Sequence, residues 1–163
     1  MSSLLERLRQ HQDDRGMMAN LRCSLVDNKK HRAWPFLNRL GVQIDNKTAT
    51  IIAALYATHP EETRDGNLGD TCRAIEQQRD DKRSDDSKLT PTERRFQHLL
   101  SAERGDELNS RILRIVLMAK AKSVPVNYER LETDLKYWNE RTRTEWATAF
   151  WAQGVVPGNE VVV

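Results

Sequence analysis

The sequence predicts an all-α fold, a helical bundle of about eight or nine helices in two lobes joined by a charged flexible loop. Through most of the 163 residues, apolar side chains recur at spacings of three and four, as on the buried stripe of a helix. Sustained alternation with the period typical of strands occurs only from Val155 to Val163, a stretch too short to build a sheet alone.

The first third is expected to form several short helices. After a small amphipathic opening helix, Asp13 or Asp14 can cap a second helix, on which Arg15 and Arg22 share about the same side. A basic cluster follows, and Pro35 after it kinks the next helix or restarts it. The members of this cluster are Lys29, Lys30, His31 and Arg32. Such a cluster is often only the solvated start of a helix.

Core and polar stretches then follow one another. Residues 51–57 predict a strongly apolar core helix, and a loop at 61–69 leads into another short helix. From Gln77 to Lys88 nearly every residue is polar, so this segment has nothing to bury and is expected to be a flexible linker. The expected division is an N-terminal lobe at 1–76, a linker at 77–89, a C-terminal lobe at 90–152 and a tail at 153–163.

The C-terminal lobe carries the clearest helix signals. The run from Thr90 to Glu93 forms a capping box with proline at the first helical position, and Arg94 and Arg95 follow on the first turn. The next helix, from a cap at Asp106 to about Lys122, is apolar nearly all round and is therefore expected to be central.

Three basic residues, Arg111, Arg114 and Lys122, fall within an arc of about 80° beside the apolar stripe of that central helix. After Pro125, residues from Tyr128 to Trp138 line a third helix. A second capping box at 142–145 is expected to open the last helix, whose apolar face is completed by Trp146 and Phe150.

Charge and cysteine content narrow the class of protein. The formal net charge is only +2, so bulk charge does not require a nucleic-acid partner, although the first 60 residues carry nine Lys and Arg against five acids. Cys23 and Cys72 show no metal-ligand spacing and are expected to be buried free thiols. No apolar run reaches the roughly 18 residues of a membrane span, so a cytoplasmic protein with no membrane contact is expected.

No arrangement of residues predicts catalysis. The four histidines lie on different elements, and none pairs with a carboxylate at metal-ligand or relay spacing. The motifs of phosphate loops, dinucleotide sites, nucleophilic serines and zinc peptidases do not occur. We therefore expect no catalytic residue, no metal and no cofactor.

What recurs instead is arginine or lysine at helix starts and beside apolar faces. For a single such residue, pairing with a nearby acid is the better explanation. A whole set, in a protein without catalytic motifs, is better explained by a phosphate-lined partner. The predicted nucleic-acid-binding residues are Arg15, Arg22, Lys29, Lys30, Arg32, Arg94, Arg95, Arg111, Arg114, Lys122, Arg141 and Arg143.

Short motifs follow one another from Arg15 to Trp151. They are Leu21-Arg22, Leu55-Tyr56-Ala57-Thr58-His59-Pro60, Gly66-Asn67-Leu68-Gly69, Glu93-Arg94-Arg95-Phe96 with Leu99-Leu100, Leu113-Arg114-Ile115-Val116, Tyr128 with Leu131, Asp134-Leu135 and Trp138, and Trp146-Ala147 with Phe150. Their order and spacing resemble the CasB family, the small subunit of the type I-E CRISPR surveillance complex Cascade. The family often has a second arginine after the Leu-Arg pair, where this chain has Cys23, and the acidic middle loop is longer here than the family pattern requires.

The resemblance implies an α-helical protein without enzymatic activity. Members of the family lie as a pair of copies in Cascade, between the large subunit CasA and the backbone of CasC copies. They stabilise the R-loop, holding the target DNA strand on the guide RNA and offering a basic track to the displaced strand.

The residues alone leave a second function open. A helical protein–protein adaptor would use the same arginines against acidic protein surfaces and would not bind nucleic acid. Binding to DNA and RNA of any sequence that falls steeply with salt would favour the first function, and no binding at about 50 mM salt would favour the adaptor.

Overall fold

The predicted all-α class is confirmed over residues 3–78 and 89–152, which the computed structural model describes. The only bridge among these residues is an isolated pair between Glu62 and Val126. The helices are α1 (Leu4–Gln10), α2 (Arg15–Arg22), α3 (Trp34–Arg39), α4 (Lys47–Thr58), α5 (Leu68–Gln77), α6 (Pro91–Leu100), α7 (Asp106–Ala121), α8 (Tyr128–Lys136) and α9 (Glu140–Trp151), with 3-10 segments η1 (Cys23–Leu25) and η2 (Asp27–Ala33).

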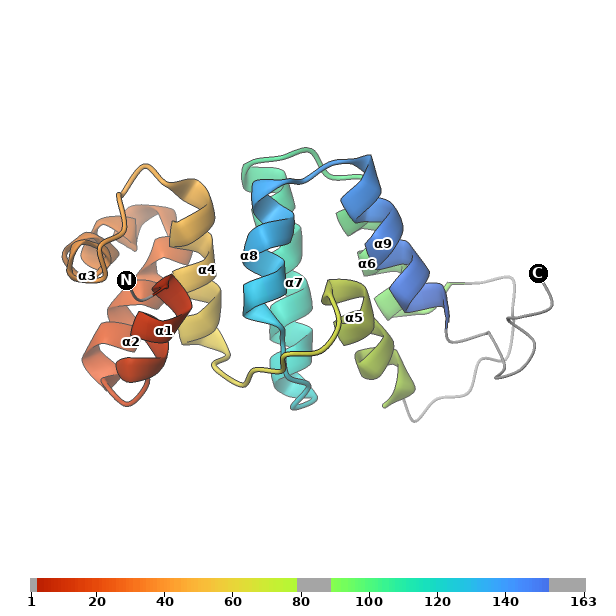
Figure 1. Ribbon diagram of the computed structural model, residues 1–163, viewed down its shortest axis with the longest axis horizontal. Helices are drawn as coiled ribbons and strands as arrows, with labels where there is room; N and C mark the ends of the chain where they lie inside the picture. The colour runs from red at the N-terminus through yellow and green to blue at the C-terminus, as the bar shows by residue number, and fades with distance from the viewer. Residues whose placement is uncertain (1–2, 79–88, 153–163) are drawn as a thin grey trace.

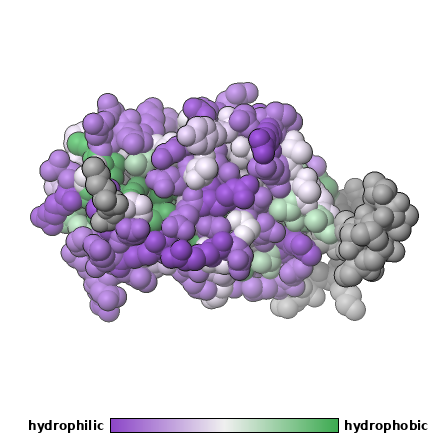
Figure 2. Space-filling view, viewed as in Figure 1, coloured by the Kyte–Doolittle hydropathy of each residue, from purple (hydrophilic) through white to green (hydrophobic). Residues whose placement is uncertain are grey.

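The helices are arranged along one long axis (Figure 1). Helices α1 to α4 occupy one end, α7 and α8 the middle, and α5, α6 and α9 the other end, with α7 behind α8 and α6 behind α9 in this view. Figure 2 shows the same face as mainly hydrophilic, with hydrophobic side chains gathered over the N-terminal helices. On this face, apolar surface therefore concentrates at the N-terminal end.

Helix α4 is the centre of the N-terminal group. Every residue from Ile51 to Thr58 is buried, because α1, α2, α7 and α8 all pack around this apolar helix. At its C-terminal end the Tyr128 hydroxyl lies 2.6 Å from the His59 carbonyl oxygen and 3.1 Å from that of Leu55. The hydroxyl is placed to donate to carbonyl oxygens at this helix end, so Tyr128 ties α8 to the end of α4.

Helix α5 packs against α9, α7 and α6, although the expected division places it in the N-terminal lobe. Its start is fixed by a capping box between Asn67 and Asp70. Gly69 lies so close to the Trp146 carbonyl that a Cβ there would overlap it. The division into lobes stays a prediction, and most of the expected linker (79–88) and the tail (153–163) lie outside the described residues.

Three local expectations are wrong. Helix α9 begins at Glu140 with Asn139 as its cap, so the capping box expected at 142–145 is not formed. Asp106 is the first residue of α7 rather than its cap, which is Gly105 with a φ of 117°. Helix α8 ends at Lys136, so Trp138 lies beyond it, yet Trp138 is buried at 8% exposure.

Helix α7 is less central than its composition suggests. The expected core residues Leu108, Ile112 and Val116 are buried, whereas Leu117 on the other side is 46% exposed. Among the described elements, only α4, α5 and α6 make extensive contacts with α7, so one of its flanks remains open. That flank carries Arg111 and Arg114, two of the predicted nucleic-acid-binding residues.

Candidate nucleic-acid interface

The structure brings three predicted arginines together on neighbouring helices. Arg95 lies in the first turns of α6, and Arg114 lies one turn after Arg111 on α7. Arg95 and Arg114 line one hollow, and Arg111 and Arg114 line the hollow next to it. The Arg111 guanidinium donates to Nδ1 of His98 at 2.9 Å, which joins α7 to the end of α6. We call Arg95, His98, Arg111 and Arg114 the α6–α7 cluster.

The α6–α7 cluster has little negative charge around it. Among the described residues, Glu107 is the one carboxylate that lines these two hollows, and its Oε2 lies 3.6 Å from Arg111. The Arg114 side chain has no hydrogen bond or ion pair to another described residue, and Arg95 donates only to the Met118 sulfur, at 3.3 Å. The guanidinium donors of Arg95 and Arg114 therefore remain largely available for an anion, whereas Arg111 already contacts His98 and Glu107.

A second group of predicted residues lies at the other end of the molecule. Arg15, Lys29, Lys30 and Arg32 are all exposed on α2 and η2. Arg22 instead donates to the Ala57 carbonyl oxygen at 2.8 Å, where it satisfies an unpaired group in the last turn of α4. We call these five residues the N-terminal cluster.

Adjoining hollows connect the two clusters. One, between η2 and α7, is lined by Lys30, Asp27 and Asp106, and the next, which shares both aspartates, extends to Ser110. Ser110 also lines the hollow of Arg111. A shallow path thus runs from η2 to α7, with acidic residues in its middle that separate the clusters.

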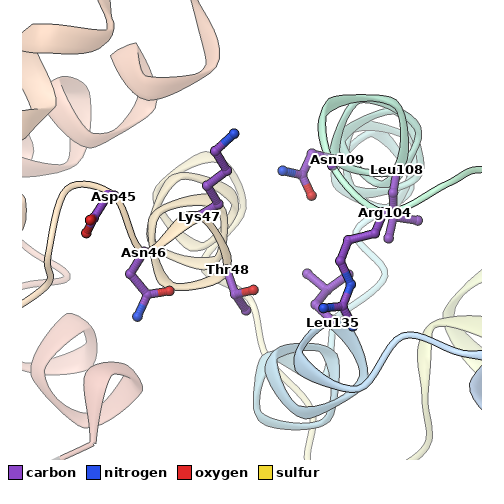
Figure 3. Close-up of a pocket in the computed structure, with 9 residues that line it drawn as sticks. Asp45, Asn46, Lys47, Thr48, Arg104, Leu108, Asn109 and Leu135 are labelled. Carbon is purple, nitrogen blue, oxygen red and sulfur yellow. The ribbon is translucent and has the colours of Figure 1, made fainter.

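Sequence reasoning missed two further basic residues on this path. Lys47, at the start of α4, and Arg104, just before α7, flank the hollow drawn in Figure 3. This hollow shares Lys47 and Asn109 with the hollow of Lys30. Arg104 also donates to the Lys136 carbonyl oxygen at 3.1 Å. Lys47 directly follows the cap residue Asn46, and that place at a helix start was the one signal available.

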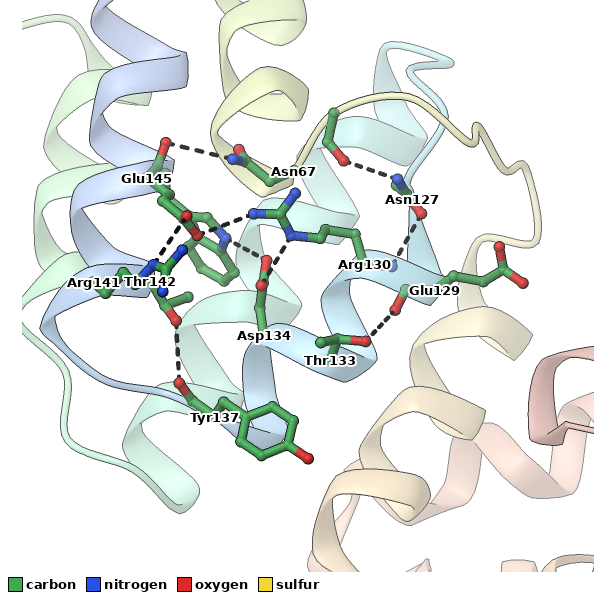
Figure 4. Close-up of polar contacts among 12 residues, drawn as sticks. Asn67, Asn127, Glu129, Arg130, Thr133, Asp134, Tyr137, Arg141, Thr142 and Glu145 are labelled. Atoms are coloured by element: carbon green, nitrogen blue, oxygen red, sulfur yellow. Dashed lines mark hydrogen bonds and ion pairs between the residues drawn. The ribbon is translucent and has the colours of Figure 1, made fainter.

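The remaining predicted residues do not join these clusters. Arg94 donates to the Leu89 carbonyl oxygen at 3.2 Å, and Lys122 is the exposed C-cap of α7. Arg141 pairs with Glu145 at 3.5 Å, in the polar network shown in Figure 4. Arg143 lies over the Trp138 ring and donates to the Ala102 carbonyl oxygen at 3.0 Å.

Arg130, at the centre of that network, shows how a structural arginine differs from the α6–α7 cluster. It contacts Asp134 at 3.0 Å and Glu145 at 3.1 Å, and Asp134 also accepts from the Trp146 indole at 2.7 Å. The hydrogen bond to Asp134 raises the pKa of Arg130. Its donors are used inside the protein, so Arg130 is a poor candidate for phosphate.

The reactive side chains of the described residues are dispersed. No three of their His, Cys, Asp and Glu side chains are grouped as a metal ion would require. Cys72 is buried as expected, and burial raises the pKa of its thiol, whereas Cys23 is only partly buried. None of the described helices is long and apolar enough to span a membrane.

Comparisons with known proteins agree with the fold. Residues 17–151 match the family model of the CRISPR-associated protein Cse2. The crystal structure of CasB from Thermus thermophilus superposes with a TM-score of 0.70 at 20% identity, covering 91% of this chain and 96% of that one. CasB from Thermobifida fusca gives a TM-score of 0.65, also at 20% identity, covering 90% and 94%. No curated protein was found to match the sequence.

Proposed function

The chain belongs to the CRISPR-associated Cse2 family, and on that premise we propose that it is a non-catalytic small subunit of the type I-E surveillance complex Cascade. In this role it binds nucleic acid and stabilises the R-loop, in which the target DNA strand pairs with the guide RNA, together with the displaced strand. Its partners are the large subunit CasA, the backbone CasC copies and a second copy of this chain.

The α6–α7 cluster is the observation that supports nucleic-acid binding most strongly. It presents Arg95, Arg111 and Arg114 on one surface, where Glu107 is the single carboxylate beside them among the described residues. A guanidinium binds phosphate oxygens through several donors at once. Contacts to phosphate carry no sequence information, which suits a subunit that must accept any target.

Weak contacts are enough for this role. The RNA–DNA duplex formed in an R-loop is about as stable as the DNA duplex it replaces, so the exchange is nearly balanced. Three phosphate contacts of about 1 kcal/mol each would shift that balance by a factor on the order of 100. Phosphate binding by the α6–α7 cluster alone would therefore be sufficient to stabilise the open state.

The proposal is tested by assembling Cascade with and without this protein and measuring the lifetime of the R-loop on a matched target. We expect the R-loop to dissociate at least about tenfold faster without the protein. A complex carrying alanine at Arg95, Arg111 and Arg114 should behave like the one that lacks the protein.

The adaptor function is the alternative that the same experiment decides. If the triple-alanine protein still enters the complex and R-loop lifetime is unchanged, the arginines do not act on nucleic acid. If the protein does not enter the complex at all, membership of Cascade is wrong for this chain.

A further inference from the structure

Next to the α6–α7 cluster lies an apolar notch on the open flank of α7. Its floor is formed by Leu117, Met118 and Ala121, and Arg95 and Arg114 line it with them. Leu117 is 46% exposed, one of the most exposed large apolar side chains among the described residues. Covering Leu117 removes apolar surface from water, which favours binding of a partner that fits the notch.

The rim of the notch is positively charged and unpaired. The Arg95 guanidinium is held beside the Met118 sulfur at 3.3 Å rather than by a carboxylate, and no acidic residue in the described part of the chain lines the notch. Arg114 belongs both to this notch and to the neighbouring hollow with Arg111 and His98. An occupant must therefore combine an apolar face with at least two negative charges next to it.

A single strand of nucleic acid has this combination. Each nucleotide joins a flat base, with weakly polar faces, to a phosphate, and proteins that bind single strands place bases on aromatic side chains beside a basic groove. Here Leu117 and Met118 offer the base face an apolar surface in place of an aromatic ring. A duplex does not, because its bases are stacked inside and only sugar and phosphate would reach Leu117.

Resting on the function proposed above, we infer that the notch takes one unpaired base of single-stranded nucleic acid. The base lies against Leu117 and Met118, its flanking phosphates contact Arg95 and Arg114, and the next phosphate along the strand reaches Arg111. Contact with the base face distinguishes single strand from duplex, which arginines alone would not do.

The test compares two strands with the same phosphates. Fluorescence anisotropy of the full-length protein would be measured with an oligothymidine of about 12 nucleotides and with the same backbone lacking all bases. We expect the strand with bases to bind at least about fivefold tighter, because a base that covers Leu117 and Met118 removes apolar surface from water. Leu117→Ser should remove this preference while leaving the salt dependence of binding unchanged.

Val26→Ser is the matched control. Val26 is 45% exposed, lies between η1 and η2 and lines none of the hollows described above, so this variant should keep the full preference for the strand with bases. Circular dichroism melts would confirm that both variants are folded.

Three outcomes would overturn the inference, and they separate it from the proposed function. Equal affinity of the wild-type protein for both strands would show phosphate binding without a base site, which leaves the proposed function intact. A preference that persists in Leu117→Ser would place the base contact elsewhere. Absence of binding to either strand at about 50 mM salt would remove both the inference and nucleic-acid binding by the isolated protein.

Discussion

Arg114 and Arg143 carry the same charge in different surroundings. Arg114 is exposed, and its side chain contacts no other described residue through a hydrogen bond or an ion pair. Arg143 is partly buried, lies 5.2 Å from the Trp138 ring centroid and donates to the Ala102 carbonyl oxygen. One guanidinium is free to bind a ligand, and the other holds the turn between α6 and α7 against the start of α9.

Replacing these two arginines with alanine should therefore give opposite results. Arg114→Ala should weaken binding to all DNA sequences equally and reduce the slope of log affinity against log salt by about one, with unfolding free energy changed by no more than about 0.5 kcal/mol. Arg143→Ala should leave that slope unchanged and destabilise the fold by about 2 kcal/mol. Gel-shift titrations at several salt concentrations and urea melts measure both quantities, and loss of DNA binding in Arg143→Ala alone would reverse the assignment.

Trp138 lies in the turn between the end of α8 and the start of α9, and its side chain stabilises this turn. Its ring packs on Trp146 with centroids 4.9 Å apart, and its indole donates to the Ala102 carbonyl oxygen at 3.4 Å. Trp138→Ala should cost about 3–5 kcal/mol, because it leaves a cavity where the indole packs on Trp146. A change below about 1 kcal/mol in chemical denaturation would mean that this turn is peripheral.

At the scale of elements, the contact between α5 and α9 depends on one glycine. The Asn67 side chain donates to the Glu145 carbonyl oxygen at 3.4 Å, and Gly69 follows it against the backbone of Trp146. Any side chain at position 69 would separate the two helices at their closest approach.

Gly69→Ala should accordingly destabilise the protein by about 2 kcal/mol or more, because the backbone must shift to admit a methyl group. Gly16→Ala, in the first turn of α2, is the control, since a Cβ there would lie 3.6 Å from Asp14 Oδ1, at ordinary van der Waals distance. That variant should be neutral or more stable by up to about 1 kcal/mol. Similar melting temperatures for both variants would contradict the close approach of α5 and α9.

Capping shows which local features the sequence predicts well. The box at Thr90 and Glu93 is formed as expected, because proline at the first helical position leaves one place for the helix to begin. The box expected at 142–145 fails because Asn139, three residues earlier, caps α9 instead. Where two possible caps are of similar strength, packing decides which one forms. Here Thr142 is buried, and the local sequence pattern does not reveal that burial.

At the scale of the whole molecule, the sequence predicted the class of fold and the three arginines of the α6–α7 cluster, but not how they meet. Arg95 is 16 residues before Arg111, and only the packing of α6 on α7 places them on adjoining hollows. The path past Lys47 and Arg104 depends on contacts between α4, α7 and α8, which periodicity does not reveal.

The buried core predicts how stability depends on pH. Burial raises the pKa of Tyr128 and of Cys72, so the folded state keeps protons that the unfolded chain releases above about pH 9–10. Their stabilisation is fully present below that range and is lost as pH rises, by up to about 1.4 kcal/mol per pH unit for each group. Urea melts between about pH 8 and 11 should show this fall, and Tyr128→Phe should make it shallower. An equal slope in both proteins would contradict it.

Phosphate binding by the α6–α7 cluster is tested most directly by measuring the affinity for a single strand of nucleic acid at several salt concentrations. The measurement compares the wild type with a variant that carries alanine at Arg95, Arg111 and Arg114. The control carries the same charge change at Arg39, Lys120 and Lys136, which are exposed and do not line these hollows. We expect the slope of log affinity against log salt to fall by about two in the cluster variant and by no more than about 0.5 in the control. Equal losses in the two variants would show that only net charge matters and would contradict the assignment of this surface.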